Sequence, residues 1–341
     1  MKKSIFIVLY AFLMVLFPLT SGYSQNLVIS PDGIAYITLF TKNNWNKIIK
    51  YNPIGKSSNT YYLFQQSQCI MSNYPSLDIN GNKIAIESSC GLVILDTKSK
   101  SELSSLKYGD SYSFSPKGDS IVYSTDYRGR LEGVAPPHNY ESGIWIYVFK
   151  SGATKKILNE SLGSYDYINW SEHDGNIYLY KAGKVESYDV LKQRIEETSY
   201  RGIYFSPDGK YYASTPGEGV HHKLYRACDN KEMLEWNNIT ISNAKQYNGI
   251  INFKFWCKKI KAVVFSVANT ENIILDFEKG KSIGDFSGRV IGTNSEGTVV
   301  AIHPKKTDGT DSWEKEKVEI LNLEEVVSKY QAGKYYRNDQ R

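Results

Sequence analysis

One turn sequence constrains this chain more than any other feature. Residues 204–213 read Tyr-Phe-Ser-Pro-Asp-Gly-Lys-Tyr-Tyr-Ala. In such a turn Pro207 presets φ, the Asp208 side chain hydrogen-bonds to the local backbone, and Gly209 supplies a positive φ. The flanking runs predict the two strands of a tight β-hairpin. The same signal recurs at 30–33, 80–81, 115–118 and 174–175, with weaker copies at 257–259 and 296–297.

A β-rich run follows each of these turns, and a third and a more polar fourth run complete most units. The runs directly after the turns are predicted at 34–41, 83–88, 120–125, 177–181, 210–215, 260–267 and 298–302. The units recur at about the 40–45 residues of a propeller blade. Because a four-stranded unit alone leaves a hydrophobic face bare, the units must stack against one another. We therefore predict an all-β fold, a β-propeller of four-stranded antiparallel blades, with seven blades as the leading count and six as the alternative.

The two ends of the chain differ from the repeats. Lys2 and Lys3 precede an apolar run at 5–19, and Gly22 and Ser24 fit the small-residue positions of a cleavage site. We expect a cleaved signal peptide at 1–24, a propeller domain at 25–330 and a polar C-terminal tail at 331–341. Residues 323–330 fit either the fourth strand of the last blade or a short helix. After signal cleavage we expect no transmembrane segment.

The repeat itself resembles a known family. A Ser-Pro-Asp-Gly turn, a strand, a small-residue turn and a strand ending in Asp, as at Asp96 and Asp276, are similar to the WD-like repeat of TolB-type β-propellers. The second, fourth, sixth and seventh units lack the Ser-Pro pair. The resemblance implies a non-enzymatic, exported propeller that acts as a protein-interaction platform in the bacterial envelope. Its expected place is the periplasm or the secreted or cell-surface fraction, and its implied partner is anchored in the outer membrane or the peptidoglycan layer.

Propeller topology predicts which loops share a face. The tight turns lie on one face, and the longer and irregular loops, which carry binding groups more often, lie on the other. The longest of these loops is 126–143. Tyr, Trp and Arg are side chains that interfaces favour. Our candidate binding residues on this face are Trp45, Tyr127, Arg128, Arg130, His138, Tyr140, His221, His222 and Trp313.

The chemistry-bearing residues do not form a catalytic pattern. His221 and His222, with His138 or His303, provide a weak basis for a metal site, because no Asp or Glu has the local spacing to complete it. The first strands, expected to line an axial channel, carry mostly aromatic and apolar side chains: Tyr112, Phe114, Tyr167, Asn169, Ile203, Phe205, Phe253 and Phe255. We expect no metal, no cofactor and no catalysis. A lyase or hydrolase with an axial-pocket site is the alternative, and a carbohydrate-binding propeller that stacks sugars on Trp45, Trp313 and Tyr127 is a third hypothesis.

The net charge argues against a nucleic-acid partner, and the absence of a hydrolase motif argues against peptidase activity. The formal net charge of +5 falls to +3 when Lys2 and Lys3 are removed, which is too weak a bias for nucleic acid. A propeller peptidase is disfavoured because the chain has no Gly-x-Ser-x-Gly elbow. We expect a monomer that binds a protein partner in the cell envelope.

The four cysteines predict disulfides in an exported protein. The predicted blade map places Cys69 near Cys90 on one face and Cys228 near Cys257 on the other. We therefore expect Cys69–Cys90 and Cys228–Cys257 bonds, each contributing about 2–4 kcal/mol to stability. Four free thiols buried as small apolar residues are the alternative.

Overall fold

The described strands pair into antiparallel sheets in chain order. The computed structural model describes residues 26–30, 34–39, 47–52, 57–63, 76–78, 80–88, 91–107, 109–125, 140–159, 167–181, 183–214, 222–233, 251–267, 271–305 and 319–333. Clustering of contacts divides the chain into two compact units. Unit 1 comprises 1–64, 220–222 and 233–341, and unit 2 comprises 65–219 and 223–232.

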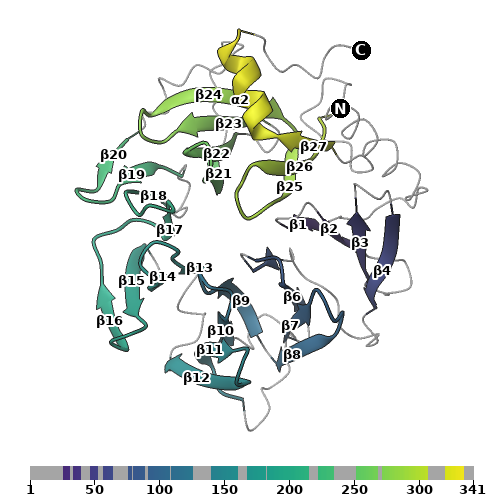
Figure 1. Ribbon diagram of the computed structural model, residues 1–341. Coiled ribbons are helices and arrows are strands. Elements are labelled where there is room, and N and C mark those ends of the chain that lie inside the picture. Colours follow the sequence, from purple (N-terminus) through teal and green to yellow (C-terminus); the bar gives the residue numbers. More distant parts are fainter. Residues whose placement is uncertain are drawn as a thin grey trace, which may run out of the picture. The chain divides into compact units, whose positions relative to one another are not determined.

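Unit 1 holds blade one, blade six and a smaller seventh sheet (Figure 1). Blade one is β1 (Asn26–Ile29), β2 (Ala35–Leu39), β3 (Lys47–Asn52) and β4 (Ser57–Leu63). Blade six is β21 (Ile251–Cys257), β22 (Ala262–Val267), β23 (Glu271–Asp276) and β24 (Lys281–Ser287). The seventh sheet is β25 (Arg289–Thr293), β26 (Val299–His303) and β27 (Glu319–Asn322), and helix α2 (Leu323–Gln331) follows it.

Unit 2 holds blades two to five. Blade two is β5 (Ser76–Leu77), β6 (Lys83–Ser88), β7 (Gly91–Asp96) and β8 (Glu102–Lys107). Blade three is β9 (Gly109–Phe114), β10 (Ser120–Thr125), β11 (Gly143–Val148) and β12 (Ala153–Leu158). Blade four is β13 (Tyr167–Trp170), β14 (Ile177–Lys181), β15 (Lys184–Asp189) and β16 (Arg194–Glu197). Blade five is β17 (Tyr204–Phe205), β18 (Tyr211–Ala213), β19 (Leu224–Arg226) and β20 (Lys231–Glu232).

These sheets confirm the predicted fold class, an all-β propeller of four-stranded antiparallel blades. Six four-stranded blades are found among the described residues, which is the lower of the two predicted counts. The seventh predicted unit has three described strands, and the segment that fitted either a strand or a helix is α2. Each tight turn predicted from the sequence joins the first and second strands of its unit.

The turn at 206–209 has the hydrogen bonds that its sequence predicts. The Ser206 hydroxyl donates to Asp208 Oδ1 at 2.7 Å and accepts from the Tyr211 N–H at 3.0 Å. Gly209, at φ +69°, donates its N–H to Ser206 O at 2.8 Å. The Lys210 N–H donates to Asp208 Oδ1 at 3.1 Å, so the side chains of Ser206 and Asp208 both bind the local backbone, as the turn sequence predicts.

Hydrophobic clusters between neighbouring blades make up the core of unit 2. One cluster joins blades two and three and includes Leu92, Ile121 and Tyr123; another joins blades three and four through Ile144 and Ile177. Several side chains expected to line a channel instead pack into such clusters. Tyr112 and Phe114 lie against the first, and Phe205 packs with Ile203 between blades four and five. Tyr112 also donates its hydroxyl to Ala85 O at 3.0 Å.

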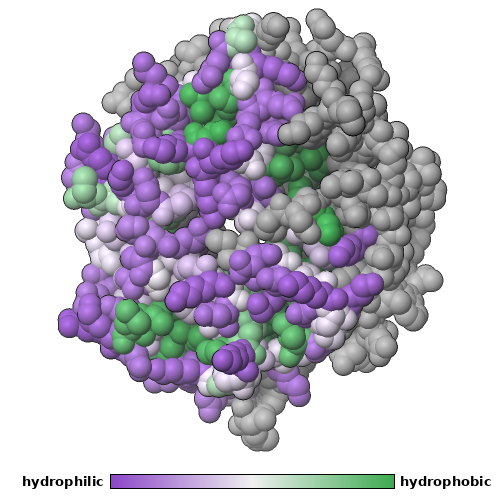
Figure 2. Space-filling view, in the orientation of Figure 1, coloured by the Kyte–Doolittle hydropathy of each residue, from purple (hydrophilic) through white to green (hydrophobic). Residues whose placement is uncertain are grey.

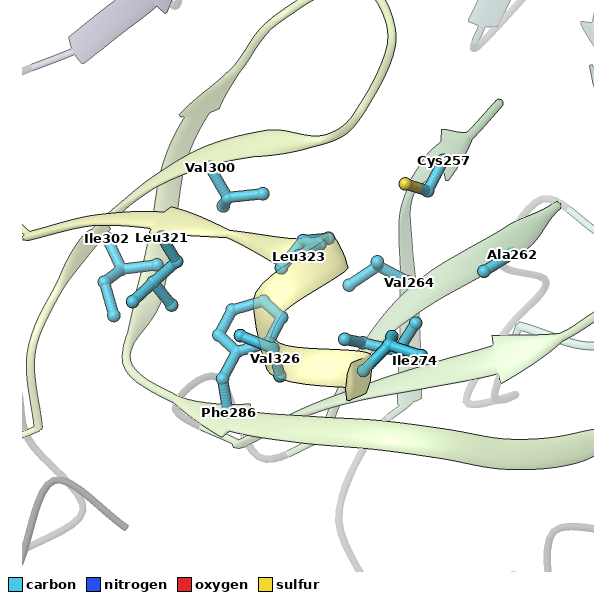
Figure 3. Packing of buried hydrophobic residues seen from close by; sticks show 11 residues of the cluster. Cys257, Ala262, Val264, Ile274, Phe286, Val300, Ile302, Leu321, Leu323 and Val326 are labelled. Carbon is cyan, nitrogen blue, oxygen red and sulfur yellow. The ribbon is translucent and has the colours of Figure 1, made fainter. Parts of the chain in front are cut away.

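The core of unit 1 includes α2. Leu323, Val326 and Val327 of the helix are buried against Val264, Ile274 and Phe286 of blade six and against Val300, Ile302 and Leu321 of the seventh sheet (Figure 3). The helix begins where the Asn322 side chain accepts the Glu324 N–H at 2.9 Å, a standard N-cap. Among the described residues, no helix has the length and apolarity needed to cross a membrane.

Candidate functional site

Two of the predicted binding residues, Tyr140 and His222, lie in the described part of the chain. Tyr140 is half-buried at the end of the long loop of blade three. His222 is buried, and its backbone N–H donates to Ile251 O at 2.9 Å. The remaining candidates lie outside the described residues: Trp45, Tyr127, Arg128, Arg130, His138, His221 and Trp313.

Of the four histidines considered for a metal site, His222 and His303 lie in the described residues, and both are buried. His222 is 6% exposed and His303 is 4% exposed. The described ranges contain no group of three or more His, Cys, Asp or Glu side chains positioned to hold a metal ion.

The predicted Cys228–Cys257 disulfide is wrong. Both residues are free cysteines, one exposed and one buried. Cys257 ends β21, and its thiol points into the cluster formed with Ala262 and Val264 (Figure 3). Burial raises the pKa of this thiol to about 12. Cys228 follows β19 and Cys257 ends β21, close to the predicted blade positions, but the Cys257 side chain lies in the core. The predicted Cys69–Cys90 bond lies outside the described residues.

A hydrogen-bonded clamp at the base of the long loop is the clearest candidate for a binding site. Residues 126–142 join β10 to β11, and Thr125 pairs with Gly143 at the ends of these strands. The Thr125 hydroxyl lies 2.8 Å from Glu141 O, to which it donates. The Trp145 indole N–H donates to the same hydroxyl oxygen at 3.2 Å. One threonine therefore ties the two ends of the loop to an aromatic side chain on β11.

A lysine from the outer strand completes the clamp. Lys156 on β12 is the cross-strand partner of Trp145, and its ammonium group lies 5.2 Å from the centre of the indole ring. The same group is 3.4 Å from a carboxylate oxygen of Glu141. Gly143, at φ +153°, leaves room for this crossing, because a Cβ there would lie 2.6 Å from Lys156 Cε. The result is a surface of aromatic, cationic and anionic groups held by three different elements.

The clamp lies next to a buried part of β10. Tyr123, two residues before Thr125, is 5% exposed and packs in the cluster between blades two and three. Burial, with a smaller contribution from Tyr147, raises the pKa of Tyr123 to about 12. Sequence reasoning selected the loop but missed Thr125, Trp145 and Lys156. The sequence signal for these residues is that Thr125 and Gly143 flank the longest loop and that Trp145 lies two residues after Gly143.

A second polar group lies in unit 1 where the loops of blade six and the seventh sheet meet. Lys305 is 3.1 Å from one oxygen of Glu271, and the Ser287 hydroxyl donates to the other at 2.6 Å. Beside them, buried Asn272 donates its amide to Gly288 O at 2.7 Å. These bonds link β23, β24 and the start of the seventh sheet, so the group has a clear structural role.

Comparison with known proteins identifies the fold. No protein-family model matches the chain, and no curated protein matches it. A solved structure titled mitotic checkpoint complex matches with a TM-score of 0.55 and 10% sequence identity, over 88% of this chain and 86% of that one. The chain is a β-propeller.

A second solved propeller is less similar in shape. TolB from Acinetobacter baumannii matches with a TM-score of 0.44 and 15% identity, over 77% of this chain. The chain described here spans 62% of the length of that TolB chain.

Proposed function

We propose that this chain is an exported, non-enzymatic β-propeller that acts as a protein-interaction platform in the bacterial cell envelope. The observation that carries the proposal is the clamp at the base of loop 126–142, where Thr125, Glu141, Trp145 and Lys156 meet. The Ser-Pro-Asp-Gly repeat supports a place among the TolB-type propellers. The lysine-flanked apolar run near the N-terminus supports export.

The geometry of the clamp favours binding over catalysis. Because the two ends of the loop are held by hydrogen bonds and strand pairing, less conformational freedom is lost at these ends on association, so more of the contact energy appears as affinity. Trp is among the side chains that contribute most at protein interfaces. Lys156 and Glu141 flank the indole with both signs of charge, which gives a protein partner polar groups to pair with around an apolar centre.

A capture experiment with matched variants tests this proposal. The mature chain is used as bait in envelope extract, and captured proteins are identified by mass spectrometry and then purified for affinity measurement. We compare the wild type, a Gly-Ser replacement of 126–142, Trp145→Ala, and the control Tyr167→Ser, which removes an aromatic side chain that is 38% exposed on β13.

The expected result is one partner whose binding is abolished by the loop replacement and weakened about tenfold by Trp145→Ala. Tyr167→Ser should bind as the wild type does. Unchanged binding after loop replacement would move the site elsewhere. Turnover of a small molecule by the purified chain would contradict the non-enzymatic assignment.

A further inference from the structure

β16 is the outer strand of blade four, and its side chains are exposed throughout. All four residues of β16 are exposed, and Ile195 is 36% exposed. Leu191, in the turn that leads into the strand, is 93% exposed. On its outer side β16 pairs with no strand of the described residues. Hydrophobic side chains reach the surface near β12 and β16, between hydrophilic ones (Figure 2).

The register of β16 shows which of its backbone N–H and C=O groups point away from β15. The Thr198 N–H donates to Val185 O at 2.9 Å, directly after the paired Glu186 and Glu197. Hydrogen-bonded and non-hydrogen-bonded pairs alternate along an antiparallel ladder. The backbone groups of Glu196 and Arg194 therefore point toward β15, and those of Ile195 and Glu197 point outward.

In place of the monomer expected from the sequence, we propose that β16 pairs with β16 of a second copy of this chain, antiparallel, with Ile195 opposite Ile195 at the two-fold axis. Ile195 then exchanges both of its outward hydrogen bonds with its counterpart. This register also places Arg194 of each copy opposite Glu196 of the other. A two-fold pair is isologous, so one complementary relationship is made twice.

The charges make this edge self-complementary. Arg194 and Glu196 lie on the same face of the strand, because Arg194 Nε is 3.1 Å from a Glu196 oxygen within one copy. In the proposed pair the Arg194–Glu196 positions are non-hydrogen-bonded, and their side chains approach most closely there. β12, the outer strand of blade three, carries adjacent Lys155 and Lys156, and lysines on an edge strand oppose pairing.

Sedimentation velocity of the mature chain over a range of concentrations tests the proposal. We expect a weak dimer that dissociates on dilution and in high salt, since exposed ion pairs are screened. Arg194→Glu and Glu196→Arg each place like charges opposite one another twice and should weaken dimerisation about tenfold. The double variant restores opposite charges and should restore the dimer.

Lys281→Glu on β24 is the matched control for Arg194→Glu, because it changes the net charge by the same amount at another exposed outer-strand position and should leave the dimer unchanged. Circular dichroism checks that each variant is folded. Hydrogen exchange gives a second readout: the Ile195 amide should slow with rising concentration, while the Glu196 amide, already bonded to β15, should not. A monomer at every concentration, or a folded double variant that fails to dimerise, would overturn the proposal.

Discussion

Gly209 of blade five lies directly against the imidazole ring of His173 in the corresponding turn of blade four, so closely that a Cβ at residue 209 would overlap the ring. Blades two and three make an equivalent contact, where a Cβ at Gly118 would lie 2.6 Å from an Asp78 oxygen. Gly118 and Gly209 therefore have two roles. They adopt a positive φ, and they allow neighbouring blades to approach.

We predict that Gly209→Ala destabilises the protein more than Gly175→Ala does. Both residues have positive φ, +69° and +74°, but Gly175 has no atom within 4 Å of the added Cβ. Gly175→Ala should lower the free energy of unfolding by about 1 kcal/mol, from the backbone conformation alone. Gly209→Ala should lower it by about 1–3 kcal/mol more, because of the clash. Urea unfolding measures the difference. The double variant Gly209→Ala/His173→Ala should approach the Gly175→Ala value, and equal costs for the two single variants would contradict the packing role.

We predict that stability falls as the pH is lowered from about 5 toward 2, because turn carboxylates bind protons less readily when folded. Hydrogen bonding to the Arg226 side chain lowers the pKa of Asp229 to about 2. The Lys192 backbone N–H and side chain lower the pKa of Asp189. A lowered folded pKa gives stability that is present above the unfolded pKa of about 3.9 and is lost as the pH falls through the folded value.

Denaturation of Asp229→Asn and Asp189→Asn at pH 7 and pH 3 measures this contribution. Asn keeps a hydrogen-bond acceptor but cannot titrate. The stability lost between the two pH values should therefore be smaller in each variant than in the wild type. An identical loss would show that other groups control the acid response.

We predict that Cys228 reacts with a thiol reagent in the native protein and Cys257 does not. Cys228 is exposed, whereas burial raises the pKa of Cys257 to about 12, so almost no thiolate forms near pH 8. Both should react after denaturation. Peptide mapping without reduction should show no Cys228–Cys257 crosslink, and the same map tests the predicted Cys69–Cys90 bond.

We predict that Thr125→Val loosens loop 126–142. Valine has the same shape but cannot donate to Glu141 O or accept from Trp145. The substitution should therefore lower the free energy of unfolding by about 1–3 kcal/mol. Limited proteolysis should cleave within the loop faster than in the wild type. Thr154→Val, at an exposed position on β12, should change neither stability nor cleavage by a measurable amount. Equal cleavage rates for both variants would argue against the clamp.

We predict that Leu323→Ala destabilises the protein by about 2–5 kcal/mol, because the side chain is fully buried under α2. Glu325→Ala, on the exposed side of the same helix, should stay within about 0.5 kcal/mol of the wild type. Thermal or urea unfolding compares them. Similar small effects for both would mean that the helix contributes little to the core.

The turns and strands could be predicted because their signals are local. Ser206, Asp208 and Gly209 satisfy one another within a few residues, so the hairpin can be recognised without knowledge of its neighbours. The sequence of α2 fits two structures, because Val326 and Val327 favour a strand whereas Leu323, Val326, Val327 and Tyr330 have helical spacing. Burial of these apolar side chains against blade six stabilises the helix.

The clamp and the cysteines depend on relations that a single sequence does not display. Trp145 meets Lys156 because the register of β11 and β12 shifts at Ile144, and no local pattern predicts that bulge. Cys257 was placed at the correct end of its strand, but a strand sends successive side chains to opposite faces. The predicted bond needed the Cys257 side chain outside the core, and the observed register directs it inward.

The position of α2 has a consequence for folding. Leu323, Val326 and Val327 cover apolar side chains that belong to residues as early as Cys257. A stretch of chain that ends before residue 323 therefore lacks the cover for Val264, Ile274 and Phe286. Such an incomplete chain has an exposed apolar surface of the kind that leads to aggregation. The core of blade six is thus complete only after a helix that lies C-terminal to all of its strands has docked.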